Sequence, residues 1–139
     1  MFNILIDTGF WIALYDSSRM SQFYSDAERI SKEIIDQQII IPYPTLYEFV
    51  NSRFSRKESV IEFQKILTRP NVIRLSDSEY KEIALEEFFI KHKYAYSDLS
   101  LVDEIIKLIL KDRNLRIDYI VSYDSALKNE AMSIGIRLV

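Results

Sequence analysis

Short runs of Ile, Leu and Val that alternate with longer stretches are the feature that most limits the folds open to this chain. The runs cover residues 3–7, 38–42, 71–75, 118–122 and the closing 136–139. They are mostly continuous apolar runs, without the alternation of a half-exposed strand, which is typical of strands buried on both faces. We therefore expect five short strands in a mostly parallel sheet.

The intervening stretches carry helical signals. We predict helices over residues 10–15, 20–36, 45–55, 58–68, 99–112 and 125–133, and another that follows Ser76 and runs to about residue 91. Ser76 and Glu79 match the Ser-x-x-Glu capping box of that helix. The alternation predicts a three-layer α/β/α sandwich around a central, mostly parallel, twisted sheet, formed by a single domain over residues 1–139.

Composition excludes several classes of protein. Hydrophobic residues make up 48% of the 139 residues and charged residues 28%, which fits a globular core and argues against disorder. The absence of cysteine excludes disulfides and thiolate metal sites. No apolar run approaches the roughly 20 residues of a membrane span, and the first residues lack a signal peptide's basic region. We expect a cytoplasmic protein with no membrane segment.

The net charge of −3 argues against a protein that coats nucleic acid through bulk electrostatics. A cluster of acids at one site could give the same balance while the rest of the surface stays neutral or basic. The positions of the acids therefore matter more than their sum.

The triplet Asp7-Thr8-Gly9 resembles the signature of aspartic proteases. Those enzymes are mostly β-structures rich in glycine, whereas this chain has two glycines and an α/β pattern. We therefore interpret Asp7 as an acid at the end of the first strand. Asp124 stands just after the fourth strand, so in a parallel sheet both carboxylates reach the same edge. Each could also simply cap the helix that follows, since Asp is a preferred N-cap residue.

Two further acids can reach this edge. Glu48 lies one turn into the helix after the second strand; on its helical wheel it falls on a polar side, where a solvated role is the simpler interpretation. Asp103 borders an apolar stripe, where a carboxylate is costly unless it is paired or bound to metal. Glu104 falls on the polar side of the same helix. Asp98 is the natural N-cap of that helix, with Ser100 as the alternative, and is a weaker candidate for the site.

Four neighbouring carboxylates repel one another unless a cation compensates them. Mg²⁺ and Mn²⁺ prefer carboxylate and water oxygens, and such ions can activate water for attack on a phosphodiester. The predicted chemistry is phosphodiester hydrolysis without a covalent intermediate.

Four segments in this order resemble the PIN-domain ribonucleases, in particular the toxins of VapBC-type toxin–antitoxin pairs. They are "ILIDTGFWIAL", "PTLYEFVN", "LSLVDEIIKLIL" and "YIVSYDSALKNEAMSIGIRLV", which together span nearly the whole chain. The resemblance implies a doubly wound PIN-like sandwich, dependence on Mg²⁺ or Mn²⁺, a homodimer, an antitoxin partner, and cleavage of structured RNA such as tRNA.

Carried across by position, the resemblance implies that Asp7, Glu48, Asp103 and Asp124 are the metal-binding catalytic acids. Thr8 and Ser122 match the small hydroxyl positions beside the first and last of them. The chain departs from the pattern in two places: Ser-Tyr-Asp replaces the common Thr-x-Asp, and Ser125 stands where a basic residue often follows the last acid.

Two basic clusters are candidates for contacts with the RNA backbone. The first comprises Arg53, Arg56 and Lys57; the second comprises Lys91 and Lys93, next to tyrosines. Solvated surface is the alternative for both clusters. His92, the only histidine, lies in a charge-rich stretch and is best interpreted as a surface residue.

The leading hypothesis is a divalent-metal-dependent endoribonuclease that acts as the toxin of a toxin–antitoxin pair. The alternative is a noncatalytic PIN-like module that binds RNA or a protein. A haloacid-dehalogenase-type phosphatase requires a second Asp where Gly9 stands, and a receiver domain requires an acid after the third strand, which "NVIRLS" lacks.

Overall fold

The computed structural model describes residues 1–16, 19–50, 57–95 and 99–139. In chain order the elements are β1 (Asn3–Ile6), α1 (Thr8–Tyr15), the 3-10 helix η1 (Ser21–Phe23), α2 (Tyr24–Glu33), β2 (Gln38–Pro42), α3 (Tyr43–Val50), α4 (Lys57–Leu67), β3 (Val72–Leu75), α5 (Lys81–Tyr94), α6 (Leu101–Lys111), β4 (Tyr119–Val121), α7 (Ser125–Ser133) and β5 (Arg137–Leu138).

The five strands form one parallel sheet in the order β3-β2-β1-β4-β5, which confirms the predicted parallel sheet. The central strand β1 pairs with β2 and β4, with Leu5 opposite Ile40 and Ile6 opposite Val121. The carboxyl ends of these three strands therefore meet at one edge of the sheet.

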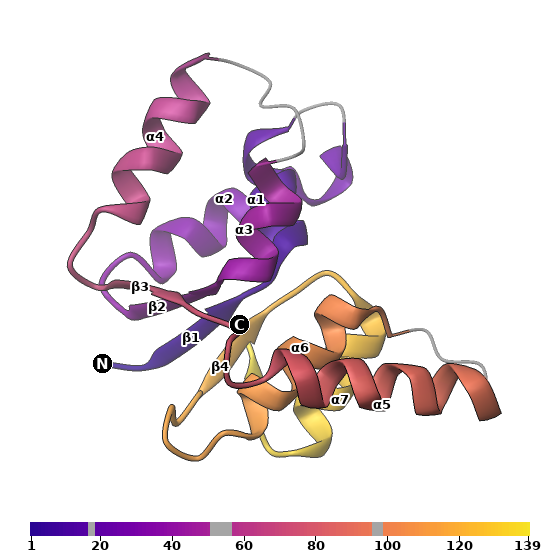
Figure 1. The fold of residues 1–139 in the computed structure, drawn as a ribbon. Coiled ribbons are helices and arrows are strands. Elements are labelled where there is room, and N and C mark those ends of the chain that lie inside the picture. The colour runs from indigo at the N-terminus through magenta and orange to yellow at the C-terminus, as the bar shows by residue number, and fades with distance from the viewer. Residues whose placement is uncertain (17–18, 51–56, 96–98) are drawn as a thin grey trace.

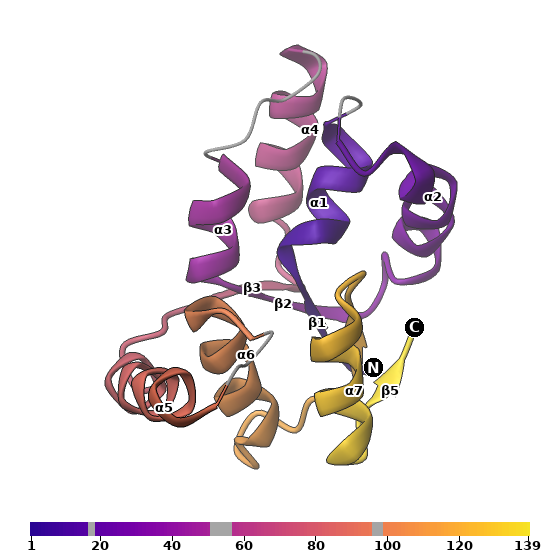
Figure 2. The ribbon, with the colours of Figure 1, turned by 90° about the vertical axis from the view of Figure 1, so that its right-hand side faces the viewer.

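The side chains of β1 alternate between two hydrophobic cores, one on each face of the sheet. Ile4 and Ile6 pack with residues of α1 to α4, whereas Leu5 packs with residues of α5, α6 and α7. The helices divide accordingly, with α1 to α4 on one side of the sheet and α5 to α7 on the other (Figures 1 and 2). This arrangement confirms the predicted α/β/α sandwich.

The predicted capping box at Ser76 and Glu79 is wrong. The Ser76 hydroxyl instead hydrogen-bonds Ser78 Oγ at 3.1 Å, and α5 begins only at Lys81. The helix starts late because a turn at residues 77–80 packs Tyr80 into the core against α6. Helix α5 then continues to Tyr94, beyond the predicted end at about residue 91.

Helix boundaries differ elsewhere too. The single helix predicted over 20–36 is η1 followed by α2, which ends at Glu33. Helix α1 begins at Thr8 rather than at residue 10, because the Asp7 side chain caps it. Within the described ranges, no helix is both long and apolar enough to span a bilayer.

Candidate active site

Asp7 lies at the end of β1 and is only 7% exposed. Its two carboxylate oxygens accept different hydrogen bonds. The Thr8 backbone N–H donates to Oδ1 at 2.8 Å, and the Ser122 hydroxyl donates to Oδ2 at 2.9 Å. Asp7 is therefore the N-cap of α1 and, through Ser122, is joined to the end of the neighbouring strand β4.

Thr8 joins Asp7 to the second predicted acid. Its hydroxyl donates a hydrogen bond of 2.8 Å to Glu48 Oε1 on α3. Glu48 is exposed, as its helical wheel predicted, but its carboxylate is turned toward the edge where β1 ends. One residue thus contacts two acids, through its backbone N–H and its hydroxyl.

Ser122 plays the corresponding part on the other side of Asp7. Its hydroxyl oxygen accepts a hydrogen bond of 3.1 Å from the Asp124 backbone N–H while the hydroxyl donates to Asp7. Asp124 in turn caps α7, since its Oδ1 accepts from the Leu127 N–H at 2.9 Å. Both expected strand-end acids are therefore helix caps as well as neighbours at the same edge.

Asp103 reaches the edge from the first turn of α6. It forms a capping box with Ser100: the Ser100 N–H donates to Asp103 Oδ2, and the Asp103 N–H donates to Ser100 Oγ, each at 3.1 Å. Ser100, the predicted alternative to Asp98, is thus the N-cap of α6. The box fixes the Asp103 carboxylate relative to the start of its own helix.

The four acids interact electrostatically. Burial raises the pKa of Asp7 to about 6, and the charges of Asp103 and Glu48 add to the rise, although the hydrogen bonds from Thr8 and Ser122 oppose it. Burial also raises the pKa of Asp103, with a further contribution from the charge of Asp124. The four predicted acids are therefore linked in succession by their charges: Glu48 and Asp103 act on Asp7, and Asp124 acts on Asp103.

Asparagine in place of Asp7 is expected to stabilise the metal-free protein. The raised pKa means that the folded state holds the Asp7 proton more tightly than the unfolded chain. The folded state is therefore destabilised progressively as pH rises from 3.8 to about 6, while Asp7 loses its proton. Above that range, the ionised carboxylate lowers the free energy of unfolding by about 3 kcal/mol. Asparagine keeps only one oxygen for the Thr8 and Ser122 hydrogen bonds, so we expect a net gain of about 1 kcal/mol.

Thermal melts in EDTA at about pH 8 and about pH 4 measure this gain, which should disappear or become a loss at the lower pH, because Asp7 is then protonated in the folded state and only the lost hydrogen bond remains. Asn in place of the exposed Asp36 is the matched control and should leave the midpoint unchanged. A lower midpoint for Asp7→Asn than for the wild type at the higher pH would contradict the destabilisation attributed to the ionised Asp7 carboxylate.

The donor set fits a hard divalent cation in its chemistry, since all four candidates are carboxylates that repel one another. Their present orientation is not that of a formed metal site: among the described residues, no three Asp, Glu or His side chains are grouped closely enough to hold an ion. Glu48 is turned to the Thr8 hydroxyl and Asp103 to the Ser100 N–H. Metal binding would therefore require these two carboxylates to reorient.

The structure describes only some of the basic residues that were predicted to contact RNA. Arg53, Arg56 and Asp98 lie outside the described residues. Lys57 and Lys93 are exposed, and the Lys93 amine lies 5.6 Å from the centre of the Tyr94 ring. Lys91 instead bonds Glu104 at 2.7 Å.

Glu104 falls on the polar side of α6, as predicted, but this position is not exposed. Its side chain is 0% exposed and faces α5, where it meets Lys91. The helical wheel of α6 considers one helix alone, whereas α5 covers this position in the folded chain. No pattern in the local sequence indicates the pair, whose members are 13 residues apart.

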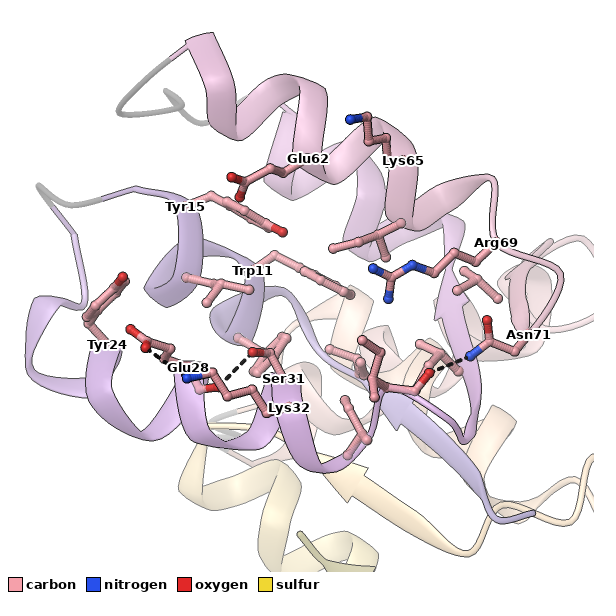
Figure 3. Close-up of a pocket in the computed structure, with 18 residues that line it drawn as sticks. Trp11, Tyr15, Tyr24, Glu28, Ser31, Lys32, Glu62, Lys65, Arg69 and Asn71 are labelled. Carbon is pink, nitrogen blue, oxygen red and sulfur yellow. Dashed lines mark hydrogen bonds and ion pairs between the residues drawn. The ribbon is translucent and has the colours of Figure 1, made fainter.

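A cavity of about 510 Å³ lies apart from the acids, between α1, α2 and α4 (Figure 3). Trp11 and Tyr15 of α1 form part of its wall, and charged side chains line its rim, among them Glu28 of α2 and Arg69 after α4. Trp11 is buried, and its Nε1 has no hydrogen-bond partner in the described part of the chain.

Comparison with known proteins supports the fold. No family model matches the sequence, and no curated protein sequence matches it. The chain is similar in structure to VapC20 of Mycobacterium tuberculosis, a toxin that cleaves the sarcin-ricin loop, with a TM-score of 0.69 at 17% sequence identity. The likeness covers 96% of this chain and 95% of the neighbour. The PIN-like fold predicted from the sequence, as found in VapC toxins, is therefore the fold of this chain.

Proposed function

We propose that this protein is a divalent-metal-dependent endoribonuclease that hydrolyses RNA phosphodiester bonds and serves as the toxin of a toxin–antitoxin pair. The observation that carries the proposal is the network at the carboxyl edge of the sheet: Thr8 and Ser122 tie Asp7 to Glu48 and to the Asp124 backbone, and the charge of Asp103 acts on Asp7. A fold shared with a toxin that cleaves the sarcin-ricin loop supports the same conclusion.

In this proposal Asp7, Glu48, Asp103 and Asp124 hold Mg²⁺ or Mn²⁺. An ion held there would supply Lewis-acid polarisation of the phosphodiester and a lowered pKa for an attacking water. Thr8 orients Asp7 and Glu48 through the two hydrogen bonds described above, and Ser122 joins Asp7 to the Asp124 backbone. Asp98, close before α6 in sequence, remains a predicted supporting residue.

Manganese is expected to raise the melting temperature of the wild-type protein. A ligand that binds only the folded state at a hundred times its Kd stabilises it by about 2.7 kcal/mol, which corresponds to a rise of several degrees. Asp7→Asn should lose most of this rise, because it removes the central carboxylate. Calorimetry with and without MnCl₂ measures both, and a wild-type midpoint that does not move would contradict the metal site.

The same experiment separates the enzyme from its alternative, a noncatalytic PIN-like module that binds RNA or a protein. One observation favours that alternative: the described carboxylates are not grouped as a formed metal site. A module without metal would melt at the same temperature in manganese and in EDTA.

The proposed substrate is structured RNA, including tRNA, and the proposed place of action is the cytoplasm. The exposed Lys57 and Lys93 are suited to contacts with the phosphate backbone, and Arg53 and Arg56 are predicted to join them. The neighbouring structure belongs to a protein that acts on the sarcin-ricin loop, a structured RNA.

We place the proposed antitoxin in the cavity between α1, α2 and α4. Apolar and aromatic side chains form much of its wall, and its rim carries both signs of charge (Figure 3). These features fit a peptide segment that inserts apolar side chains. A short reading frame beside this one in the genome would support the toxin role.

The proposed homodimer has a candidate surface on α5. This helix exposes several large apolar side chains, which a second copy could cover. They are Ile83, Phe89, Ile90 and Tyr94. Sedimentation of the purified protein tests this part of the proposal.

A further inference from the structure

A buried charge directly follows Asp103 on α6. The Glu104 side chain is 0% exposed, and its Oε1 accepts a hydrogen bond of 2.7 Å from the Lys91 amine. Its other oxygen, Oε2, has no hydrogen-bond partner among the residues described. A buried carboxylate is costly unless a cation compensates it, so this position tolerates Glu104 only while Lys91 stays in place.

The pair closes one end of an antiparallel helix pair. Lys91 belongs to the last turn of α5 and Glu104 to the first turn of α6. At the opposite end, the Tyr80 hydroxyl donates a hydrogen bond of 2.6 Å to Asp112 Oδ2. The helix pair thus has two polar clamps, and only the first lies beside a predicted catalytic acid.

Other charged side chains lie near the Lys91–Glu104 ion pair. Lys107, one turn further along α6, pairs with Glu130 of α7 at 3.5 Å and also lies beside the Lys91 amine. The charge of Glu87 reaches that amine as well. The capping box at Ser100 fixes Asp103 relative to its own helix but not relative to α5. Among the ion pairs of the described residues, Lys91–Glu104 is the one that ties the first turn of α6 to the neighbouring helix.

We propose that the Lys91–Glu104 ion pair is a positioning element of the acid site. It holds the first turn of α6 against α5, and thereby fixes the position of Asp103 on that turn relative to the rest of the acid site. Lys91 is then a positioning residue, and its amine is committed to Glu104 rather than to RNA. The part of this inference that concerns metal affinity rests on the proposed function.

The test compares three variants. Lys91→Met removes the charge and keeps most of the side-chain volume. Lys91→Arg keeps the charge and can offer a second donor to the unpaired Oε2, because guanidinium binds carboxylate in a bidentate manner. Tyr80→Phe breaks the far clamp and is the matched control for loosening of the helix pair.

Hydrogen exchange of the metal-free proteins gives the first measurement. We expect Lys91→Met to speed exchange in peptides that cover the first turn of α6, and Lys91→Arg to leave it unchanged. Tyr80→Phe should affect only the last turn of that helix. Faster exchange of the first turn in Tyr80→Phe, or wild-type exchange in Lys91→Met, would overturn the proposal.

Manganese affinity gives the second measurement, by electron paramagnetic resonance at a temperature where every variant is folded. Loss of an outer residue that orients a metal ligand weakens binding by about 10-fold to 100-fold. We expect about tenfold for Lys91→Met and less than about twofold for Lys91→Arg and Tyr80→Phe. Equal affinities in Lys91→Met and wild type would overturn the role assigned to the pair.

If Lys91→Met fails to fold, Glu104→Gln replaces it in both measurements, because it keeps the volume and an acceptor oxygen while it removes the charge. Faster first-turn exchange is expected, and unchanged exchange would overturn the proposal. A wild-type protein that binds no manganese would contradict the proposed function, while the exchange result would still decide whether the pair holds the first turn of α6.

Discussion

Asparagine in place of Asp7 is expected to reduce RNA cleavage by at least about a thousandfold, equal to a loss of about 4 kcal/mol of transition-state stabilisation. The reason lies in the position of this residue within the cluster. Its two oxygens are held by Thr8 and Ser122, and its pKa responds to the charges of Asp103 and Glu48. Removing its charge therefore removes the centre of the proposed metal site.

The substitution should leave the fold intact, which makes the loss of activity interpretable. The asparagine oxygen can still accept the Thr8 N–H and cap α1. Circular dichroism and the melts in EDTA report folding independently of activity, and the exposed Asp36→Asn should cleave normally. Cleavage by Asp7→Asn at the wild-type rate in the presence of metal would refute the site assignment.

The parallel sheet and the edge of the acid site could be predicted because they depend on local signals. Residues 3–7 and 118–122 are continuously apolar, and Asp7 and Asp124 stand where those runs end. Once the strands are parallel, both acids must reach the same edge. The structure places them on either side of Ser122, which contacts both. Their role in catalysis stays a prediction.

Features that depend on packing between distant segments could not be predicted. Glu104 occupies a polar position on its own helix, and only the arrival of α5 buries it against Lys91. Likewise, a four-residue capping motif occurs at both Ser76 and Ser100, but only the second forms a box. At Ser76 the box does not form, because the chain turns to pack Tyr80 into the core before α5 begins. The four-residue motif carries no information about that packing.

The cavity is a similar case. Its wall combines side chains from α1, α2, α4 and the strands, and it exists only because these elements leave space between them. Trp11, which forms part of this wall, is buried. Its unpaired N–H depends on what surrounds the ring in three dimensions, which no pattern in the segment around it specifies.

Dependence on a divalent ion is the second prediction with a large effect. Cleavage of RNA without a metal commonly uses a general acid and a general base, a task for which histidine is suited. This chain has one histidine, His92 on α5, whose Nδ1 lies 2.8 Å from the Phe88 carbonyl and whose ring stacks on Phe88. The four acids are thus the chain's principal candidates for activating a water, and they need a cation to do so.

Incubation of total RNA with the wild-type protein in Mg²⁺, Mn²⁺ or EDTA therefore tests the central claim most directly. The account predicts discrete cleavage products in at least one of the two metals, their complete loss in EDTA, and their return when metal is added back in excess. Equal cleavage in EDTA, or intact RNA under all three conditions, would contradict it.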